Sequence, residues 1–264
     1  MRNVPFFDYP QLWLNDREDL IKIIDEVSSS GGFIMQEDLV SFELELSEYL
    51  RSGQAIGVAN ATDAMELFLQ AIGIKNGDEI IISSHTMLAT ASAIIANGGI
   101  PVPVDIGEDN LIDPDAISNS INSNTVGVMP TQLNGRTCKM DDIISICDNN
   151  SLFLVEDAAQ ALGSKYKGKC AGTFGFSSCI SFFPAKVLGC LGDAGAVIAN
   201  EENLYDKIYQ LHDHGRDIHG EVKSWGRNSR LDNLQAAILR YKLNDYDKVV
   251  DRRREIAQIY QSNL

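Results

Sequence analysis

The chain has 264 residues, of which 44% are hydrophobic and 22% are charged, a balance typical of globular rather than disordered proteins. Its 37 acidic and 22 basic side chains give a net charge of -15, which argues against a nucleic-acid-binding surface and against docking on anionic membranes. No apolar run approaches the roughly 18 residues that a membrane helix needs. The five cysteines are odd in number and include no C-x-x-C pair, so we expect reduced thiols in a cytoplasmic protein.

Two amphipathic helices are predicted first, over residues 16–27 and 37–50, because apolar residues recur at helical spacing. Seven short apolar runs follow as predicted strands, over residues 55–59, 79–82, 101–105, 125–129, 152–155, 179–183 and 194–198. Helical patterns lie between them, over residues 63–72, 87–96 and 139–150. This alternation predicts an α/β fold with a mostly parallel seven-stranded sheet flanked by helices.

The last part of the chain is predicted to be helical apart from one loop. A helix over residues 201–212 precedes a polar loop over residues 213–229, and a long helical pattern runs from Leu231 to the end. We therefore expect a large domain over residues 1–245. We also expect residues 246–264 to begin a smaller C-terminal domain that is largely absent from this chain.

Ligands of open α/β sheets bind beyond the carboxyl ends of the strands, so the residues that follow each predicted strand are candidates for a site. Asn60, Ala61, Thr62 and Asp63 follow the first strand and open a helix. Free amides and a threonine hydroxyl at a helix N-terminus can bind an anion. The alternative is an ordinary helix cap, because these residue types also cap helices.

Two further candidates carry charge. Asp157 follows a buried strand, where it can cap a helix or face the cation of a ligand. Lys186 lies between apolar residues and before a glycine-rich loop, a setting in which burial lowers a lysine pKa and makes the amine a nucleophile. An anion, a cationic ring nitrogen and a carbonyl for a lysine together indicate pyridoxal phosphate. Neither G-x-G-x-x-G nor a P-loop motif is present.

At this point the sequence resembles the DegT/DnrJ/EryC1/StrS family of sugar aminotransferases, which are fold-type-I pyridoxal-phosphate enzymes. The resemblance covers nearly the whole chain. Short blocks in the same order and spacing carry it, among them Asn60-Ala61-Thr62-Asp63-Ala64, Glu156-Asp157-Ala158-Ala159-Gln160, Ser181-Phe182-Phe183-Pro184-Ala185-Lys186, His214-Gly215-Arg216 and Asn228-Ser229-Arg230-Leu231-Asp232.

The resemblance implies a role for individual residues. Lys186 would bind the cofactor covalently and move protons, and Asp157 would pair with the pyridine N–H. Gln160 would lie near the phenolic oxygen. The phosphate would be bound by Ala61, Thr62 and Ser181 and, from the neighbouring subunit, by Asn228, which implies a homodimer with a shared active site.

Three departures from the family pattern concern the pocket. Met87 stands at a ring-stacking position that is commonly aromatic, so either Met87 or His85 would pack on the cofactor ring. Gln132 and Asn134 replace a histidine and a tyrosine that flank the substrate pocket in many relatives. Ala61 replaces a usual glycine.

The implied activity is transfer of an amino group from glutamate or glutamine to a keto sugar, expected to be nucleotide-linked, in amino-sugar or surface-polysaccharide biosynthesis. Two alternatives stay open at this point: a non-catalytic or regulatory protein that binds the cofactor or a sugar, and a pyridoxal-phosphate enzyme of another reaction type. Lys186 argues against the branch of the family that has histidine there and performs dehydration. The histidines and aspartates of residues 212–219 could hold a metal ion, but the family has no metal there and none is expected.

Overall fold

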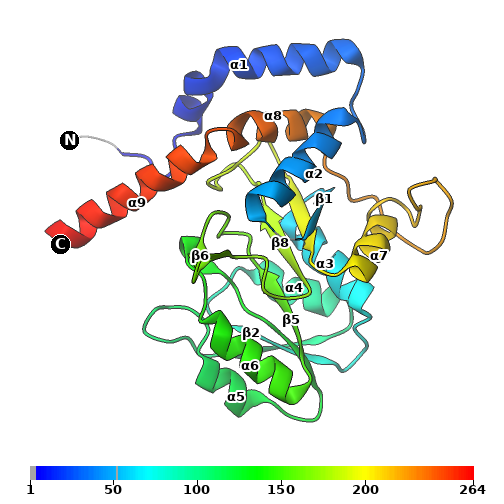
Figure 1. The fold of residues 1–264 in the computed structure, drawn as a ribbon, viewed down its shortest axis with the longest axis vertical. Coiled ribbons are helices and arrows are strands. Elements are labelled where there is room, and N and C mark those ends of the chain that lie inside the picture. The colour runs from blue at the N-terminus through cyan, green and yellow to red at the C-terminus, as the bar shows by residue number, and fades with distance from the viewer. Residues whose placement is uncertain (1–3, 52) are drawn as a thin grey trace.

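The computed structural model describes residues 4–51 and 53–264 and confirms the α/β architecture, with helices on both faces of one sheet (Figure 1). The sheet has seven strands in the order β1-β9-β8-β5-β4-β2-β3. All seven predicted strands form. Their bounds are β1 (Gln54–Val58), β2 (Glu79–Ser83), β3 (Ile100–Val104), β4 (Thr125–Met129), β5 (Phe153–Asp157), β8 (Ser177–Ser181) and β9 (Gly195–Ala199).

Strand β9 is the exception in a sheet that is otherwise parallel. It runs antiparallel to both of its neighbours, β1 and β8, whereas β3, β2, β4, β5 and β8 pair in parallel. The carboxyl ends of the other strands and the amino end of β9 therefore meet at one edge of the sheet. The candidate residues lie at or just beyond that edge.

The predicted helices are confirmed, with shifts at their ends. Those before and between the strands are α1 (Tyr9–Ser30), α2 (Glu37–Leu50), α3 (Ala61–Ile72), α4 (Leu88–Ala96) and α6 (Met140–Asn150), and α7 (Glu202–His212) follows the last strand. Helix α1 starts earlier than predicted because the Asp8 side chain caps it by accepting from the Gln11 amide. Some short elements were not predicted because they contain too few residues for a periodicity: α5 (Pro114–Ser120), a turn at Leu133–Gly135, and the hairpin of β6 (Lys165–Tyr166) and β7 (Lys169–Cys170).

The single long helical pattern predicted from Leu231 was wrong, because the structure divides it into α8 (Asn233–Leu243) and α9 (Tyr246–Asn263). Tyr246 anchors the start of α9: its ring is buried, and its hydroxyl donates to the Leu162 carbonyl at 2.9 Å. Residues 251–264 are exposed, and α9 projects away from the body (Figure 1). The domain boundary at residue 245 stays a prediction. Within the described ranges, every helix is too short or too polar to cross a membrane.

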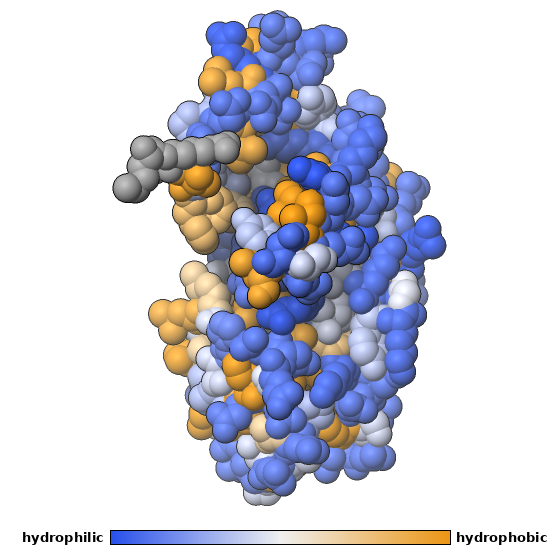
Figure 2. Space-filling view, turned by 90° about the vertical axis from the view of Figure 1, so that its left-hand side faces the viewer, coloured by the Kyte–Doolittle hydropathy of each residue, from blue (hydrophilic) through white to orange (hydrophobic). Residues whose placement is uncertain are grey.

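Alternate residues of the strands face two apolar layers, which explains their nearly continuous apolar runs. In β9, Val197 and Ala199 face the cluster under α3 and α7, whereas Ala196 and Ile198 face the cluster under α2 and α8. A third cluster lies between the sheet and α5 and α6. The face drawn in Figure 2, which includes the α9 end, is mostly hydrophilic, with more of its apolar residues toward one margin.

Candidate functional site

Asp157 is a buried carboxyl group that neutral donors hold at the end of β5. It is 3% exposed. Its Oδ2 accepts from the Thr90 hydroxyl at 2.7 Å, and its Oδ1 accepts from the Ala159 amide at 3.2 Å and the Cys179 thiol at 3.4 Å. Within the described part of the chain, Asp157 forms no ion pair. Because an unpaired buried charge is costly, this arrangement suits a ligand that brings its own cation.

Lys186 lies in the loop after β8, half-buried, and its backbone amide donates to the Phe183 carbonyl at 2.8 Å. Burial lowers the pKa of Lys186, and the nearby acidic groups, first Asp157 and then Cys179, oppose this only in part. Lys186 therefore lies close enough for the Asp157 carboxyl group to affect its pKa. In the described part of the chain, the two side chains form no ion pair with each other. The lowered pKa favours the neutral amine, which is the nucleophilic form.

The start of α3 meets the ends of two strands. Asn60 caps the helix by accepting from the Asp63 amide at 2.8 Å. The amides of Ala61 and Thr62 donate to no acceptor in the parts of the chain that the structure describes. Such free amides at a helix N-terminus, with the helix dipole behind them, bind anions.

Gly195 brings Ser181 close to the N-terminus of α3. It pairs with Val58 of β1 on one side and with Ser181 of β8 on the other. A Cβ on Gly195 would lie 2.5 Å from the Asn60 carbonyl carbon and 2.7 Å from the Ala61 nitrogen. The absence of a side chain thus lets β9 approach the first turn of α3, next to Ser181.

Gln160 is held beside the loop after β4. Its side-chain oxygen accepts from the Asn134 amide at 3.3 Å, and its carbonyl accepts from the Gly135 amide at 2.9 Å. These two hydrogen bonds join the loop of residues 130–135 to the segment after β5. Gln160 and Asn134 lie together at the edge where Asp157 ends its strand.

Gln132 differs from its expected place at the substrate pocket, because its side chain is fully buried. Its Nε2 donates to Glu156 Oε2 at 2.6 Å, and its Oε1 accepts from the Cys138 amide at 2.7 Å. Glu156 is buried too, and burial raises its pKa, although amides of Gly172, Phe174 and Gly175 also bind it. Gln132 thus belongs to a buried polar network.

Met87, His85 and Asn228 are all exposed. Met87 precedes α4 and its sulfur accepts from the Ala89 amide at 3.1 Å. Asn228 lies on the loop of residues 213–229. Its neighbour Ser229 accepts from the Ala59 amide at 3.3 Å, which places this segment next to the end of β1.

Sequence reasoning missed three threonines that connect with Asp157. Thr131 and Thr86 hydroxyls are 2.7 Å apart, as are those of Thr86 and Thr90, and Thr90 reaches Asp157. Thr90 and Thr131 are buried. The available signal was Thr90, which with Ser92 is one of the two hydroxyl side chains in a mostly apolar helical pattern, where a buried hydroxyl needs a partner.

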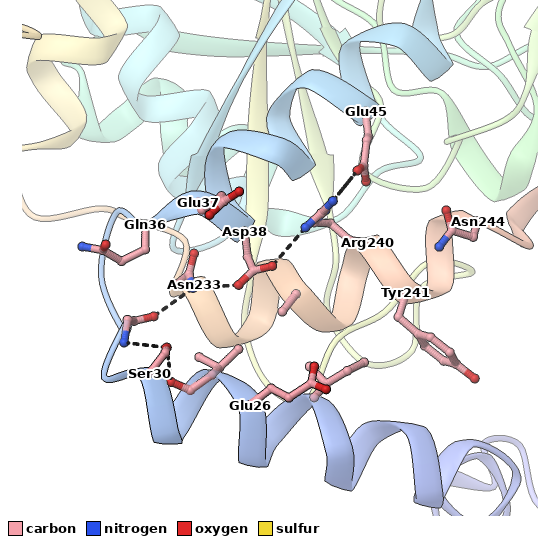
Figure 3. Close-up of a pocket in the computed structure, with 14 residues that line it drawn as sticks. Glu26, Ser30, Gln36, Glu37, Asp38, Glu45, Asn233, Arg240, Tyr241 and Asn244 are labelled. Carbon is pink, nitrogen blue, oxygen red and sulfur yellow. Dashed lines mark hydrogen bonds and ion pairs between the residues drawn. The ribbon is translucent and has the colours of Figure 1, made fainter.

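A groove of about 700 Å³ lies elsewhere, between α1, α2 and α8 (Figure 3). Its lining contains none of the candidate residues. Arg240 crosses it, donating to Asp38 at 3.0 Å and to Glu45 at 2.8 Å and 3.0 Å. The groove is therefore distinct from the cluster at the sheet edge.

The cluster fits pyridoxal phosphate. Asp157 offers a buried carboxylate without an ion pair in the described ranges, Lys186 offers an amine with a lowered pKa, and the α3 amides with Ser181 offer an anion site. No three side chains of the described residues that commonly bind metals converge on one point.

Comparison with known proteins agrees with this assignment. A dTDP-3-amino-3,4,6-trideoxy-alpha-D-glucose transaminase of Streptomyces venezuelae is 37% identical over 262 residues, which cover 99% of this chain and 69% of the relative. The crystal structure of S. venezuelae DesV with a ketimine intermediate is 36% identical, with a TM-score of 0.95, and the match covers 99% of this chain and 71% of that one.

Bacillus subtilis NtdA, solved with its cofactor PMP bound, is 35% identical with a TM-score of 0.85, and the match covers 92% of this chain and 56% of that one. The sequence pattern of one family matches residues 15–264. The chain therefore belongs to the DegT/DnrJ/EryC1/StrS aminotransferase family.

Proposed function

We propose that this protein is a pyridoxal-phosphate-dependent transaminase that moves an amino group from glutamate or glutamine to a nucleotide-linked keto sugar, in the synthesis of amino sugars for surface polysaccharides. The observation that carries the proposal is the meeting of Lys186, Asp157 and the α3 N-terminus at one edge of the sheet. The sugar-nucleotide transaminase among the relatives supports the substrate class.

When bound, pyridoxal phosphate supplies a carbonyl carbon that exchanges amino groups and a ring that accepts electrons from the substrate Cα. We assign the covalent attachment of that carbon to Lys186 Nζ. The lowered pKa of Lys186 supports this role, because a neutral amine both attacks a carbon and accepts a proton. Once displaced by the amino donor, the same Nζ would take the proton from the substrate Cα and deliver it to the cofactor carbon that had carried the carbonyl.

Asp157 would hold the proton on the ring nitrogen. A charge-assisted hydrogen bond of this kind contributes about 1.5–3 kcal/mol, and burial of Asp157 keeps water from weakening it. The amides of Ala61 and Thr62, the Thr62 hydroxyl and Ser181 would orient the phosphate. Gln160 would lie beside the phenolic oxygen, and Met87 or His85 would cover the ring.

We also propose a cytoplasmic homodimer in which Asn228 reaches the phosphate of the partner subunit. Asn228 is exposed, and its loop also exposes Ile218, Val222 and Trp225. Exposed apolar side chains grouped on one loop suit a covered interface. All five cysteines are buried and unpaired, which suits a reducing compartment.

The test is the visible absorption of the purified protein with added pyridoxal phosphate, before and after glutamate. We expect a band of covalently bound cofactor that bleaches with glutamate. Lys186→Ala should abolish the band, and Lys207→Ala, which removes an exposed lysine on α7 whose Nζ donates to the Ala71 carbonyl, should retain it. A band that bleaches equally in Lys186→Ala would refute the assignment of Lys186.

A further inference from the structure

Three threonine hydroxyls form a chain that ends on Asp157. Thr90 Oγ1 donates to Asp157 Oδ2 at 2.7 Å, Thr86 Oγ1 lies 2.7 Å from Thr90 Oγ1, and Thr131 Oγ1 lies 2.7 Å from Thr86 Oγ1. The chain joins three elements: the loop after β2, helix α4 and the loop after β4. The two ends of the chain, Thr131 and Asp157, are also joined through the backbone. The Asp157 amide donates to the Pro130 carbonyl at 3.0 Å, and the Asp157 backbone carbonyl accepts from the Gln132 amide at 2.8 Å.

With Asp157 as the acceptor from Thr90, the direction of the other two hydrogen bonds in this chain follows. A hydroxyl has one proton to donate. Because Thr90 gives its proton to Asp157, the bond between Thr86 and Thr90 must be donated by Thr86. Thr131 must then donate to Thr86. All three protons point toward the carboxylate, and hydrogen bonds aligned in this way polarise one another.

This direction leaves both carboxylate oxygens of Asp157 as acceptors. A proton on Oδ2 would face the proton of Thr90, so all three hydroxyls would have to turn before Oδ2 could act as a donor. Oδ1 is similarly bound by the Ala159 amide and the Cys179 thiol. Burial and then the charge of Asp157 raise the pKa of Cys179 well above its ordinary value, so the thiol stays a donor.

We propose that Thr90, Thr86 and Thr131 are positioning residues that act through the Thr90–Asp157 bond to hold the carboxylate as an acceptor aimed at the cofactor ring nitrogen. The inference rests on the proposed function, since it assigns these threonines a part in cofactor chemistry. Thr131 acts at the greatest distance, with two hydroxyls between it and the carboxylate.

The test compares Thr90→Val, which keeps the volume and removes the hydroxyl, with Thr90→Ser, which keeps the hydroxyl. We expect Thr90→Val to weaken binding of pyridoxal phosphate about 10- to 100-fold, as removal of a hydrogen bond to a charged group does. The pH at which the ring nitrogen of the bound cofactor loses its proton should fall, as nitrogen NMR spectra of isotope-labelled cofactor would show. With glutamate, kcat should fall more than KM changes. Thr90→Ser should restore all of these.

Thr131→Val tests the chain itself, with an expected weakening of cofactor binding of about 2- to 5-fold. In a Thr90→Val background it should have no further effect, because its route to Asp157 is already broken. Thr173→Val is the matched control, since it removes the bond of a buried threonine hydroxyl to the Cys170 carbonyl. Urea unfolding of each cofactor-free variant separates a loss of folding from a loss of positioning.

Distinct results overturn the two proposals. If the unaltered protein binds no pyridoxal phosphate, the proposed function falls and this inference falls with it. If the unaltered protein is active but Thr90→Val keeps the pH midpoint of the ring nitrogen and kcat, the threonines only pack the core. Additive effects of Thr131→Val and Thr90→Val would likewise refute a chain that acts through Thr90.

Discussion

Glu43 is a carboxyl group that the fold holds in an unusual state. It lies on α2, and its Oε1 accepts from the Gly57 amide of β1 at 2.7 Å. Burial raises the pKa of Glu43 to about 7, although the bond from Gly57 lowers it in part. Near neutral pH this side chain is therefore divided between its neutral and charged forms. It lies beside β1, the strand that leads into α3.

The raised pKa of Glu43 predicts a specific pH dependence of stability. Between pH 4.5 and about 7, the folded protein holds a proton on Glu43 that the unfolded chain has released. The contribution of Glu43 to the free energy of unfolding is therefore fully present below pH 4.5 and falls as pH rises through about 7. Glu43→Gln, which cannot ionise, should remove this fall and gain about 2 kcal/mol relative to the unaltered protein between pH 5 and pH 8.

Urea unfolding at several pH values measures this difference. Glu48→Gln, on the exposed side of the same helix, is the matched control and should leave the pH dependence unchanged. Parallel pH profiles for Glu43→Gln and the unaltered protein would show that Glu43 ionises normally.

At the scale of elements, β1 is an edge strand whose outward amides are covered. Ala55 donates to Ser47 Oγ at 3.0 Å, Gly57 donates to Glu43 at 2.7 Å, and Ala59 donates to Ser229 at 3.3 Å. An uncovered edge would be a template for pairing with another chain. Helix α2 and the loop after α7 therefore both protect the sheet and fix the strand that leads into α3.

The contact of β9 with α3 depends on Gly195. Gly195→Ala would place a Cβ against backbone atoms of Asn60 and Ala61, which cannot move without shifting the first turn of α3. We expect a loss of about 1–3 kcal/mol in unfolding free energy, as overpacking of a close contact costs. Because the same turn offers the free amides, affinity for pyridoxal phosphate should fall at least about tenfold.

Gly107→Ala is the control for Gly195→Ala. A Cβ at Gly107 would meet only the Asp109 side chain, at 3.3 Å. Calorimetry and titration with pyridoxal phosphate follow both effects. Unchanged affinity in a folded Gly195→Ala protein would mean that the phosphate is bound away from the α3 turn.

At the scale of the whole molecule, the meeting of the site residues could be predicted because it follows from topology. Asp157 and Thr62 lie 95 positions apart in the sequence, yet parallel strands bring both to one edge. The threonine chain could not be predicted, because a threonine in a helical pattern does not reveal which buried acceptor it meets. The burial of Gln132 could not be predicted either, because it depends on the fold placing Glu156 and Cys138 beside it.

The N-terminal helices are attached to the C-terminal part of the chain by Arg240. From α8 it contacts Asp38 and Glu45 of α2, about 200 positions earlier in the sequence, across the groove of Figure 3. Asn233 assists, because its side chain donates to the Gly32 carbonyl and to Asp38. Contacts so distant in sequence form only when both ends of the chain are folded.

We therefore expect Arg240→Met to reduce the free energy of unfolding by about 1–2 kcal/mol. It keeps the apolar stem but leaves Asp38 and Glu45 without their shared cation. Arg252→Met on α9 is the control: Arg252 pairs with Glu255 one turn away in an exposed helix, and its loss should cost about 0.5 kcal/mol or less. Urea unfolding at low and high salt measures both, and the Arg240 effect should shrink only in part with salt because its partners are two-thirds buried. Equal effects of the two substitutions would mean that Arg240 is an ordinary surface ion pair and that apolar packing of α2 on α8 alone joins the two ends of the chain.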